Sequence, residues 1–449
     1  MSRVKIDPTE HAKQNTGPVA APKSEVPDPG LTGPSSTFPI TTNDQRVRDE
    51  LAKLLEAARV LRPLLRENQA RTEEEGRYSP EVHEYFVEHG FYKTLLPQRF
   101  GGLELSPDAY FAVIAEIGRG CPSTAWSLSL ASAHTLTLSS YWPLAAQERI
   151  FGQHGYMVAP ASGNPRSSTI TPVEGGYRIS GTWRYCSGAP YSTHFFPTVL
   201  IPATDTTPER RAWAVLERSQ YEVLNDWGGD RGPIGMRGSG SNGIKVEEAF
   251  VPEELVVDEY FATGMATPTI GYEIHGNPMY SGAFFGFAEG EVTAATLGAG
   301  YAALDEYERI IQTTRAPFHP GSPARDTLED YLKPFGIALA KLDAAAGALF
   351  DTGRRYEEYG RRLVAGEGVF DESSAMRLNN AYLIAEELVW EAVQLLMRMA
   401  GTTFTMDGQR MQRYFRDLWT TVSRLDSLDV FATPTTRLHL SGEGGDFLS

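Results

Sequence analysis

The chain has 449 residues, 41% of them hydrophobic and 22% charged, which is enough for a large buried core divided among two or three domains. Its net charge of −16 argues against a general nucleic-acid-binding protein and against docking on an anionic membrane. Two cysteines, Cys121 and Cys186, are too few for a disulfide framework or a cysteine-ligated metal centre. We therefore expect two small buried side chains and no metal site.

The N-terminal segment, residues 1–43, is predicted to be an unfolded tail. Residues 1–40 contain seven prolines and few aliphatic or aromatic side chains, so burial cannot offset the entropy of ordering them. The first residues also lack the apolar core of a signal peptide, and no run of about 18 apolar residues could cross a membrane. We therefore expect a cytoplasmic protein.

A helical domain is predicted over residues 44–155. From Asp44 onward, apolar residues recur every three or four positions with charged residues between them, which is typical of an amphipathic helix. Further helices are predicted around residues 80–90, 107–119 and 124–140. Ser106, followed by a proline, is a suitable N-cap for the second of these.

A β-domain is predicted over residues 156–260, where β-branched and aromatic runs are separated by glycine and proline. The predicted strands are VEGGYRISGTWRY, THFFPTVLIPA, RAWAVLER and GIKVEEAFVP. A connection at 261–283 leads to a helical bundle at 284–430, and residues 431–449 are predicted to be a C-terminal tail. This order predicts a mainly α protein with a β middle domain.

The segment GMRGSGSNG contains a literal G-x-G-x-x-G pattern between Gly238 and Gly243. In a dinucleotide-binding unit this pattern follows a strand and opens a helix, whose N-terminus meets the pyrophosphate. Here it is followed by IKVEEAFVP, which alternates like a strand. We therefore interpret the segment as a glycine-rich turn between strands.

Four segments, taken in order and spacing, carry a resemblance to a known family. They are AEIGRGCPSTAWSLSLASAH (115–134), GGYRISGTWRYCSG (175–188), WGGDRGPIGMRGSGSNGIKVEEAFVPEE (227–254) and AGTTFTMDGQRMQRYFRDL (400–418). Over about residues 45–425 the chain resembles the acyl-CoA dehydrogenase fold. Within that fold it resembles the two-component, reduced-flavin-dependent monooxygenases related to p-hydroxyphenylacetate 3-hydroxylase oxygenase components. The resemblance implies an N-terminal helical domain, a β-barrel-like domain and a C-terminal four-helix bundle.

The resemblance also implies reduced FMN or FAD as the cofactor, with O2 as the oxidant. A flavin ring needs a flat apolar surface and hydrogen-bonding groups along its polar edge. The residues expected to meet it are Trp183, Tyr185, Ser187, Gly188, Ser239 and Ser241. For the flavin phosphate, Arg315 is the family-like cation. Gly401 and Thr402 lie where this superfamily lets a helix end meet the flavin, often across a subunit boundary.

The choice between a dehydrogenase and an oxygenase depends on the segment after the Arg416–Asp417 motif. Acyl-CoA dehydrogenases place a glutamate base there, whereas this chain has no glutamate after Asp417 until Glu443. The residues implied for an oxygenase are present, since the resemblance places His134 and Ser162 beside the substrate and the flavin. In that family such residues orient a phenolic substrate and help to hold a flavin C4a-hydroperoxide.

The oxygenases also carry a histidine about two helical turns after the Arg-Asp motif, but this chain has Arg424 there. Arginine stays charged at any working pH, so it can stabilise an anion but cannot shuttle a proton. Three interpretations remain open. Arg424 holds the oxygenated flavin or an acidic substrate, the enzyme performs an unusual flavin reaction, or the position is not catalytic. His439 is a further candidate if the C-terminus is rearranged.

We predict the oxygenase component of a two-component flavin monooxygenase that hydroxylates a small aromatic or polyketide-like substrate, with N- or S-oxygenation as variants. Tyr280, Phe284 and Phe285 are predicted to line the substrate pocket. The resemblance implies a homotetramer and a separate NAD(P)H-flavin reductase, because no nicotinamide site is visible in the sequence. Two alternatives are an acyl-CoA dehydrogenase or flavin oxidase, and a scaffold without catalytic activity.

Overall fold

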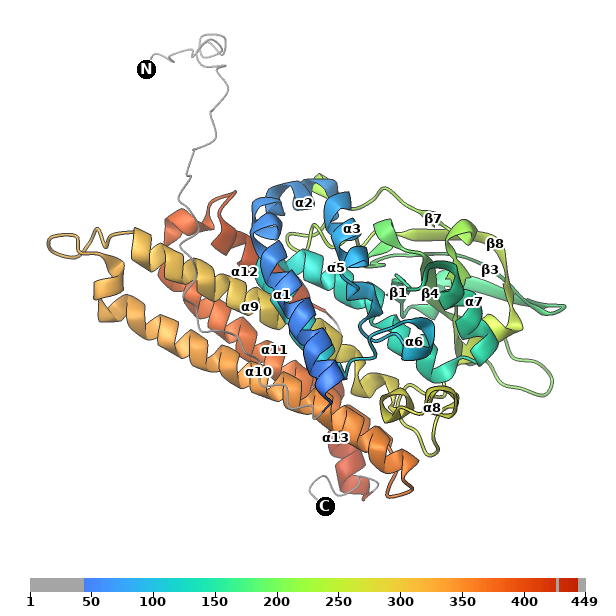
Figure 1. Cartoon of the computed structure of the whole chain (residues 1–449). Coiled ribbons are helices and arrows are strands. Elements are labelled where there is room, and N and C mark those ends of the chain that lie inside the picture. Colours follow the sequence, from blue (N-terminus) through green and yellow to red (C-terminus); the bar gives the residue numbers. More distant parts are fainter. Residues whose placement is uncertain (1–43, 425–427, 443–449) are drawn as a thin grey trace, which may run out of the picture. The chain divides into compact units, whose positions relative to one another are not determined.

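The computed structural model describes residues 44–424 and 428–442, and these form helices, then strands, then helices again (Figure 1). The described residues belong to a single folded unit. The tail predicted at residues 1–43 lies outside the described residues. The mainly α architecture with a β middle part agrees with the prediction from sequence.

The first part of the fold is helical, as predicted. Its helices are α1 (Gln45–Glu67), α2 (Gln69–Glu75), α3 (Pro80–Glu88), α4 (Pro107–Gly120), α5 (Pro122–Ser132), α6 (His134–Tyr141) and α7 (Leu144–His154). The carboxylate of Asp44 caps α1 by accepting a hydrogen bond of 2.8 Å from the backbone N–H of Arg46. Ser106 precedes α4, but its hydroxyl donates to the carboxylate of Asp108 and makes no capping bond to the backbone.

The strands of the described residues form two sheets. They are β1 (Ala161–Ser162), β2 (Ser168–Val173), β3 (Gly176–Trp183), β4 (His194–Ile201), β5 (Arg210–Ala214), β6 (Leu216–Glu217), β7 (Glu222–Val223), β8 (Ile244–Pro252) and β9 (Val256–Asp258). One sheet has the order β1-β4-β5-β9, with β6 also paired to β4, and the other has the order β2-β3-β8-β7. The four predicted runs correspond to β3, β4, β5 with β6, and β8. The glycine-rich segment 238–243 leads into β8 without a helix, so its interpretation as a turn is confirmed.

The last part of the fold is a bundle of helices. The connection contains α8 (Ile270–His275), and the bundle consists of α9 (Ala288–Thr313), α10 (Glu329–Val364), α11 (Glu372–Ala400), α12 (Arg410–Val422) and α13 (Leu428–Ser441). The prediction of a tail from residue 431 is wrong in its first part, since α13 continues to Ser441. This helix packs on α11, where the Nδ2 atom of Asn380 donates to the hydroxyl of Thr435 at 2.7 Å. Packing on a neighbour makes an otherwise polar segment helical.

The first helices are joined closely to the bundle through the contact between α4 and α9. A Cβ atom built on Gly298 of α9 would lie 2.4 Å from the carbonyl oxygen of Ala115, so only glycine lets the two backbones approach this far. Asp305 of α9 is buried between two arginines, at 2.5 Å from Arg66 and 2.6 Å from Arg119. These contacts fix α4 on the bundle. They therefore also position α5, which follows α4 directly.

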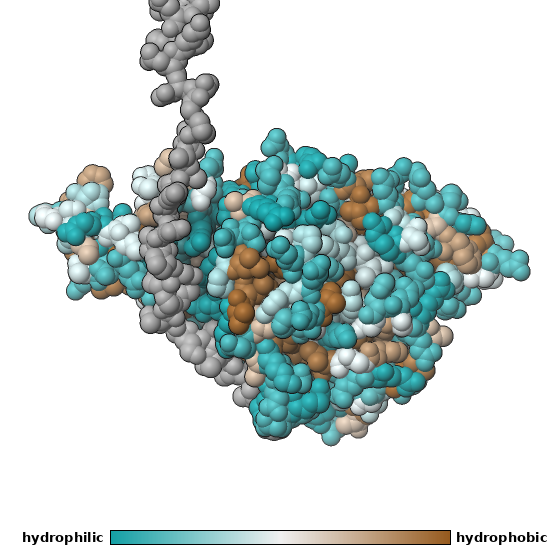
Figure 2. Space-filling model, turned by 45° about the horizontal axis from the view of Figure 1, so that its top comes forward, coloured by the Kyte–Doolittle hydropathy of each residue, from teal (hydrophilic) through white to brown (hydrophobic). Residues whose placement is uncertain are grey.

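The face of the protein shown in Figure 2 is mainly hydrophilic, with apolar patches separated by polar side chains. This agrees with the net charge of −16. Among the described residues, no helix combines the length and the apolar character needed to span a bilayer.

Candidate active site

A large cavity of about 820 Å³ lies between α5, the loops that flank β3 and β8, and α12. Three indole rings line it: Trp126 of α5, Trp227 of the loop before β8, and Trp419 of α12. Tyr185 also lines it and meets Trp227 edge to face, with 5.9 Å between the ring centroids. A volume of this size with aromatic walls suits a planar cofactor such as a flavin.

A chain of hydrogen bonds runs along one wall of this cavity. The Nε1–H of Trp126 donates to the hydroxyl of Ser187 at 3.0 Å. The hydroxyls of Ser187 and Ser241 are 2.7 Å apart, and those of Ser241 and Ser239 are 2.6 Å apart. The chain joins α5 to both loops of the β-part, so these predicted polar residues form a single network at the cavity wall.

Two glycines allow the loops to lie this close. Gly188 has a φ of +87°, and a Cβ atom there would lie 2.6 Å from the Cβ of Ala131 on α5. Gly240 has a φ of +60°, and its Cβ would meet the ring of Pro190 at 2.7 Å. The backbone N–H of Gly188 donates to the carbonyl of Ser239 at 3.1 Å. A side chain at Gly188 would push its loop away from α5, and one at Gly240 would push the two loops apart.

The Arg-Asp motif on α12 holds the loop before β8. The carboxylate of Asp417 accepts a hydrogen bond of 2.6 Å from the backbone N–H of Met236, which lines the large cavity. A Cβ atom on Gly235 would lie 2.0 Å from the carbonyl oxygen of Arg416, so helix and loop are in direct backbone contact. Asp417 is buried, and its burial, together with the nearby charge of Glu73, raises its pKa to about 7.

Arg424, at the position where the resemblance implied a histidine, lies just after α12 and lines the large cavity. Its Nη2 atom forms ion pairs with Glu289 of α9 and with Glu386 of α11, the second at 3.2 Å. Its guanidinium group also lies over the ring of Trp126, at 5.4 Å from the centroid. Two buried carboxylates therefore hold this cation in place at the cavity wall.

A second cavity of about 350 Å³ adjoins the first. The two cavities share Leu130, Tyr185 and Ser187 as lining residues. The predicted pocket residues Phe284 and Phe285 line the smaller cavity, which has a largely apolar lining. This size and character suit a small aromatic molecule placed beside a ligand in the larger cavity.

His134 lines the smaller cavity at the start of α6 and is 5% exposed. Its Nδ1 atom lies 2.9 Å from the carbonyl oxygen of Ala159. Because a carbonyl only accepts hydrogen bonds, Nδ1 must carry the proton, and Nε2 is then the acceptor of the neutral ring. Burial lowers the pKa of His134 to about 4, so the ring is neutral at physiological pH.

The smaller cavity also has an acidic wall. Glu289 and Glu291, both from the first turn of α9, line it together with Asn379 of α11. Glu291 is 5% exposed, and its burial and the proximity of Glu289 raise its pKa well above the ordinary value. At the mouth of the cavity, Glu259 is ion-paired with Arg211 at 2.5 Å.

Some predicted site residues lie outside both cavities. Trp183 is fully buried and packs edge-on against Phe195, so the indole surface of the cavity comes from other tryptophans. Tyr280 is fully buried, and its hydroxyl donates to the carbonyl of Leu95 at 3.3 Å. Both side chains therefore belong to the core of the described fold.

Ser162 lies on β1 between two residues that line the smaller cavity, Ala161 and Gly163. Side chains alternate along a strand, which explains why the flanking positions and not Ser162 itself contribute to the lining. Its carbonyl oxygen accepts a hydrogen bond of 3.0 Å from the hydroxyl of Thr198. His439, the alternative to the expected histidine, is exposed on α13.

Arg315, predicted to meet the flavin phosphate, lies with Gly401 and Thr402, predicted to meet the flavin, in a separate group at the C-terminal end of α11. Gly401 and Thr402 follow that helix, and Arg325 donates to the carbonyl of Ala400 at 2.8 Å. Arg325 also donates to the carbonyl of Arg315 at 3.3 Å. The structure therefore brings Arg315 close to Gly401, but not to the cavities of the same chain.

Several residues of the two cavities were not found from the sequence. They are Trp126, Trp227, Trp419, Trp213, Glu289, Glu291 and Asn379. A signal was available for the two glutamates, because AEGEV places two acids in the first turn of a helix that then carries no charge until Asp305. For the tryptophans no local pattern separates a cavity wall from a core position.

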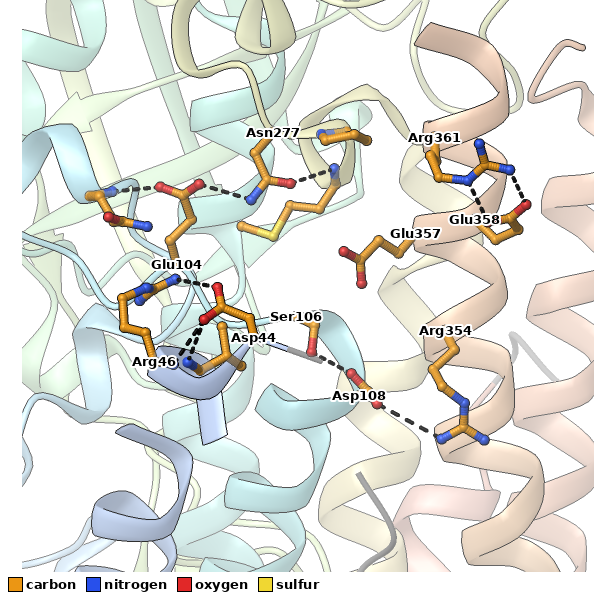
Figure 3. Close-up of a pocket in the computed structure, with 14 residues that line it drawn as sticks. Asp44, Arg46, Glu104, Ser106, Asp108, Asn277, Arg354, Glu357, Glu358 and Arg361 are labelled. Carbon is orange, nitrogen blue, oxygen red and sulfur yellow. Dashed lines mark hydrogen bonds and ion pairs between the residues drawn. The ribbon is translucent and has the colours of Figure 1, made fainter. Parts of the chain in front are cut away.

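Another cavity, of about 580 Å³, lies between the start of α1, the start of α4 and α10 (Figure 3). Asp108 approaches Arg354 at 3.8 Å, and Arg361 pairs with Glu358 at 2.6 Å. Burial and the charge of Asp108 raise the pKa of Glu357 to about 7. Its lining is charged and lacks aromatic rings, so it does not fit a flavin.

Comparison with protein families defines the class. The N-terminal domain of acyl-CoA dehydrogenase matches residues 42–146, and the C-terminal domain of acyl-CoA dehydrogenase matches residues 292–423. The protein thus has the acyl-CoA dehydrogenase fold, as predicted.

Individual relatives narrow this class. A pigment production hydroxylase from Rhodococcus sp. is 30% identical over 372 residues, which are 82% of this chain and 90% of the hydroxylase. The p-hydroxyphenylacetate 3-hydroxylase oxygenase component of Acinetobacter baumannii is 24% identical over 371 residues, 81% of this chain and 83% of that protein. The solved structure of XiaF from Streptomyces sp., in complex with FADH2 and glycerol, has a TM-score of 0.77 at 20% identity and covers 88% of this chain and 96% of its own. The chain belongs to the flavin-dependent monooxygenase oxygenase components of this fold, as the sequence predicted.

Proposed function

We propose that this oxygenase component binds reduced FMN or FAD in the larger cavity and hydroxylates a small aromatic substrate in the smaller one, with O2 as the oxidant. The contact between the two cavities is the observation that supports this most strongly. Because they share Leu130, Tyr185 and Ser187, a ring in one lies directly beside a ligand in the other. A flavin and a substrate held side by side in this way need little further alignment before they react.

The residues around the larger cavity fit a flavin. The indoles offer flat apolar surface, and the linked hydroxyls of Ser187, Ser239 and Ser241 offer hydrogen bonds to the polar edge of the ring. Reduced flavin, when bound, would supply the two electrons that activate O2, which gives one oxygen atom to the substrate and the other to water. Arg424 places a guanidinium group, fixed by Glu289 and Glu386, at the wall of this cavity.

His134 is proposed to position the substrate. Its Nε2 atom accepts the hydrogen bond of a phenolic hydroxyl, which increases the electron density of the ring that is to be hydroxylated. Phe284 and Phe285 surround the substrate with apolar surface and exclude water. Ser162 is proposed as a further polar group of this site, adjacent to the lining residues of β1.

A second copy of the chain is proposed to complete the flavin site. Arg315, Gly401 and Thr402 lie near one another but apart from the cavities of their own chain. In a homotetramer they would reach the flavin phosphates of a neighbouring subunit, with Arg325 as an additional cation. A separate NAD(P)H-flavin reductase is proposed to supply the reduced flavin.

Rapid mixing tests the proposed function. The chain is loaded anaerobically with reduced FMN or FAD and mixed with oxygenated buffer, and the near-ultraviolet and visible absorbance are recorded. We expect a transient near-ultraviolet band before the spectrum of oxidised flavin returns. Reoxidation in a single step would instead support a flavin oxidase, and failure to bind either flavin would support a scaffold without catalytic activity.

A further inference from the structure

Glu291 differs from the other acidic side chains of the smaller cavity because no cation balances it. Glu289 is ion-paired with Arg424, and Glu259 is ion-paired with Arg211. Among the described residues, neither a cation nor a hydrogen-bond donor is paired with the carboxyl group of Glu291, although the residue is 5% exposed and lines the cavity. A buried carboxyl group without a partner is costly, so its retention at a ligand cavity calls for an explanation.

Asn379 provides a second observation in the same cavity. It is 2% exposed, and its Nδ2 atom has no hydrogen-bond partner within residues 44–424 and 428–442. It lines the cavity from α11, whereas Glu291 lines it from α9. An amide donor that is buried without a partner is satisfied only when a ligand presents an oxygen or nitrogen acceptor.

The charges around the cavity favour a cationic ligand. Glu289 and Glu386 share Arg424, and Arg211 is paired with Glu259. Among the described residues that line the smaller cavity, Arg211 is the one arginine or lysine, so none is left over for Glu291. An anionic ligand would therefore be repelled, whereas an ammonium group would give Glu291 a counter-ion.

We propose that the substrate is an aromatic molecule with a basic amino group, whose ammonium ion pairs with Glu291 while a polar atom of the same molecule accepts a hydrogen bond from Asn379. This inference rests on the proposed function, because it assigns the ligand class of the smaller cavity. It also distinguishes this chain from an oxygenase that acts on aromatic acids, because the acidic wall would repel the carboxylate of such a substrate.

Binding of such a substrate is expected to release protons. Burial and the charge of Glu289 raise the pKa of Glu291, which favours its protonated form when the cavity is empty, whereas an ammonium group beside it favours the carboxylate. Of the groups that face Glu291, Glu289 is ion-paired with Arg424, Glu259 is ion-paired with Arg211, His134 is neutral, and Tyr110 of α4 has a pKa raised by burial. We therefore expect a net release of protons when the ligand binds.

Three phenols of similar size test the proposal by isothermal titration calorimetry at pH 7.5 on the full chain without flavin. Tyramine is a cation, tyrosol is neutral, and 4-hydroxyphenylacetate is an anion. We expect tyramine to bind at least about ten-fold more tightly than tyrosol, since a charge-assisted hydrogen bond is stronger than a neutral one. We expect 4-hydroxyphenylacetate to bind most weakly. Titrations in two buffers of different ionisation enthalpy measure the proton released with tyramine.

Glu291→Gln keeps the shape of the side chain and removes its charge, so it should abolish both the preference for tyramine and the proton release. Glu357→Gln is the control, because Glu357 is a half-buried glutamate that also has a raised pKa but lies in the separate polar cavity (Figure 3). If Glu291→Gln fails to fold, the binding of the three phenols to the wild type still tests the proposal. Equal binding of tyramine and tyrosol, or no measurable binding of tyramine, would overturn the proposal. The flavin reaction with O2 would be unaffected by that result, so the proposed function is tested separately.

Discussion

The backbone N–H of Met236 donates a hydrogen bond of 2.6 Å to the carboxylate of Asp417, which joins the loop before β8 to helix α12. The loop carries Ser239 and Ser241, and the helix leads to Arg424. One buried carboxylate therefore sets the distance between two walls of the larger cavity. The Arg-Asp motif acts here through backbone geometry, in addition to any electrostatic role.

Asp417→Asn and Asp417→Ala test this role. The folded-state pKa of Asp417 is raised to about 7, so the folded protein binds a proton that the unfolded chain releases near pH 4. Its contribution to the free energy of unfolding thus falls as the pH rises from about 4 to about 7, by up to about 4 kcal/mol. Asp417→Asn keeps an acceptor for Met236 and should gain stability relative to the wild type between pH 5 and pH 8, measured by urea unfolding.

Asp417→Ala leaves the N–H of Met236 without its acceptor and should cost about 1–3 kcal/mol at pH 5. It should also weaken flavin binding, which equilibrium dialysis measures. A difference between wild type and Asp417→Asn that does not change with pH would contradict the prediction.

Arg424→Ala is expected to destabilise the protein by on the order of 3 kcal/mol, because it leaves Glu289 and Glu386 buried without their shared cation. Chemical denaturation measures this loss. Arg361→Ala is the control, since that arginine forms an exposed pair with Glu358 and its removal should leave the free energy of unfolding nearly unchanged.

Arg424→His is expected to make stability depend on pH. A histidine beside two carboxylates has a raised folded-state pKa. Its stabilisation is therefore complete below the unfolded pKa of about 6.5 and is lost as the pH rises through the folded value. Denaturation curves between pH 5.5 and pH 9 measure the change, and a variant that stays as stable at pH 9 as at pH 5.5 would contradict this account.

The lowered pKa of His134 predicts that the free energy of unfolding decreases in acid. Its pKa is about 4 in the folded state and about 6.5 when unfolded, so the unfolded chain binds more protons between these values. Stability is thus present above pH 6.5 and is lost as the pH falls through 4, by about 3 kcal/mol for this residue. His134→Gln should reduce the loss measured by urea unfolding between pH 6.5 and pH 4. His89→Gln, at an exposed position, should leave the pH dependence of the wild type unchanged.

Ser241→Ala removes the central hydroxyl of the chain that links Ser187 to Ser239. If this chain holds the polar edge of the flavin, affinity for reduced FMN or FAD should fall by about five-fold, the value of one net hydrogen bond. Ser180→Ala is the control. Ser180 lies on β3, the strand that precedes the loop with Ser187, but its hydroxyl donates to the carboxylate of exposed Glu248. Equal flavin affinity in Ser241→Ala and the wild type would show that the linked serine hydroxyls do not hold the flavin.

Much of the fold could be predicted because the decisive signals are local. Apolar spacing over residues 45–67 predicts α1, and alternation with β-branched residues predicts β3, β4 and β8. The fate of residues 431–441 could not be predicted, since α13 owes its helical state to packing on α11 and not to its own pattern.

The residues of the candidate site were harder to predict from the sequence than the fold. His134, Tyr185, Ser187 and Phe284 were singled out and line the cavities, whereas Trp183 and Tyr280 were singled out and are buried in the core. An aromatic residue in a strand or turn has the same local pattern in either place. Which face it presents is decided by the elements that pack on it.

The sequence by itself determined the order of the three parts, the oxygenase family, and the presence of Arg424 where the resemblance implied a histidine, because each is read from local patterns and their order along the chain. Only the tertiary structure decided what Arg424 does. Its two carboxylate partners are separated from it by 135 and 38 positions, and they meet it only when α9, α11 and α12 pack together. The acidic wall of the smaller cavity has the same origin, since burial and the shortage of cations around Glu291 are properties of the folded site and not of any segment.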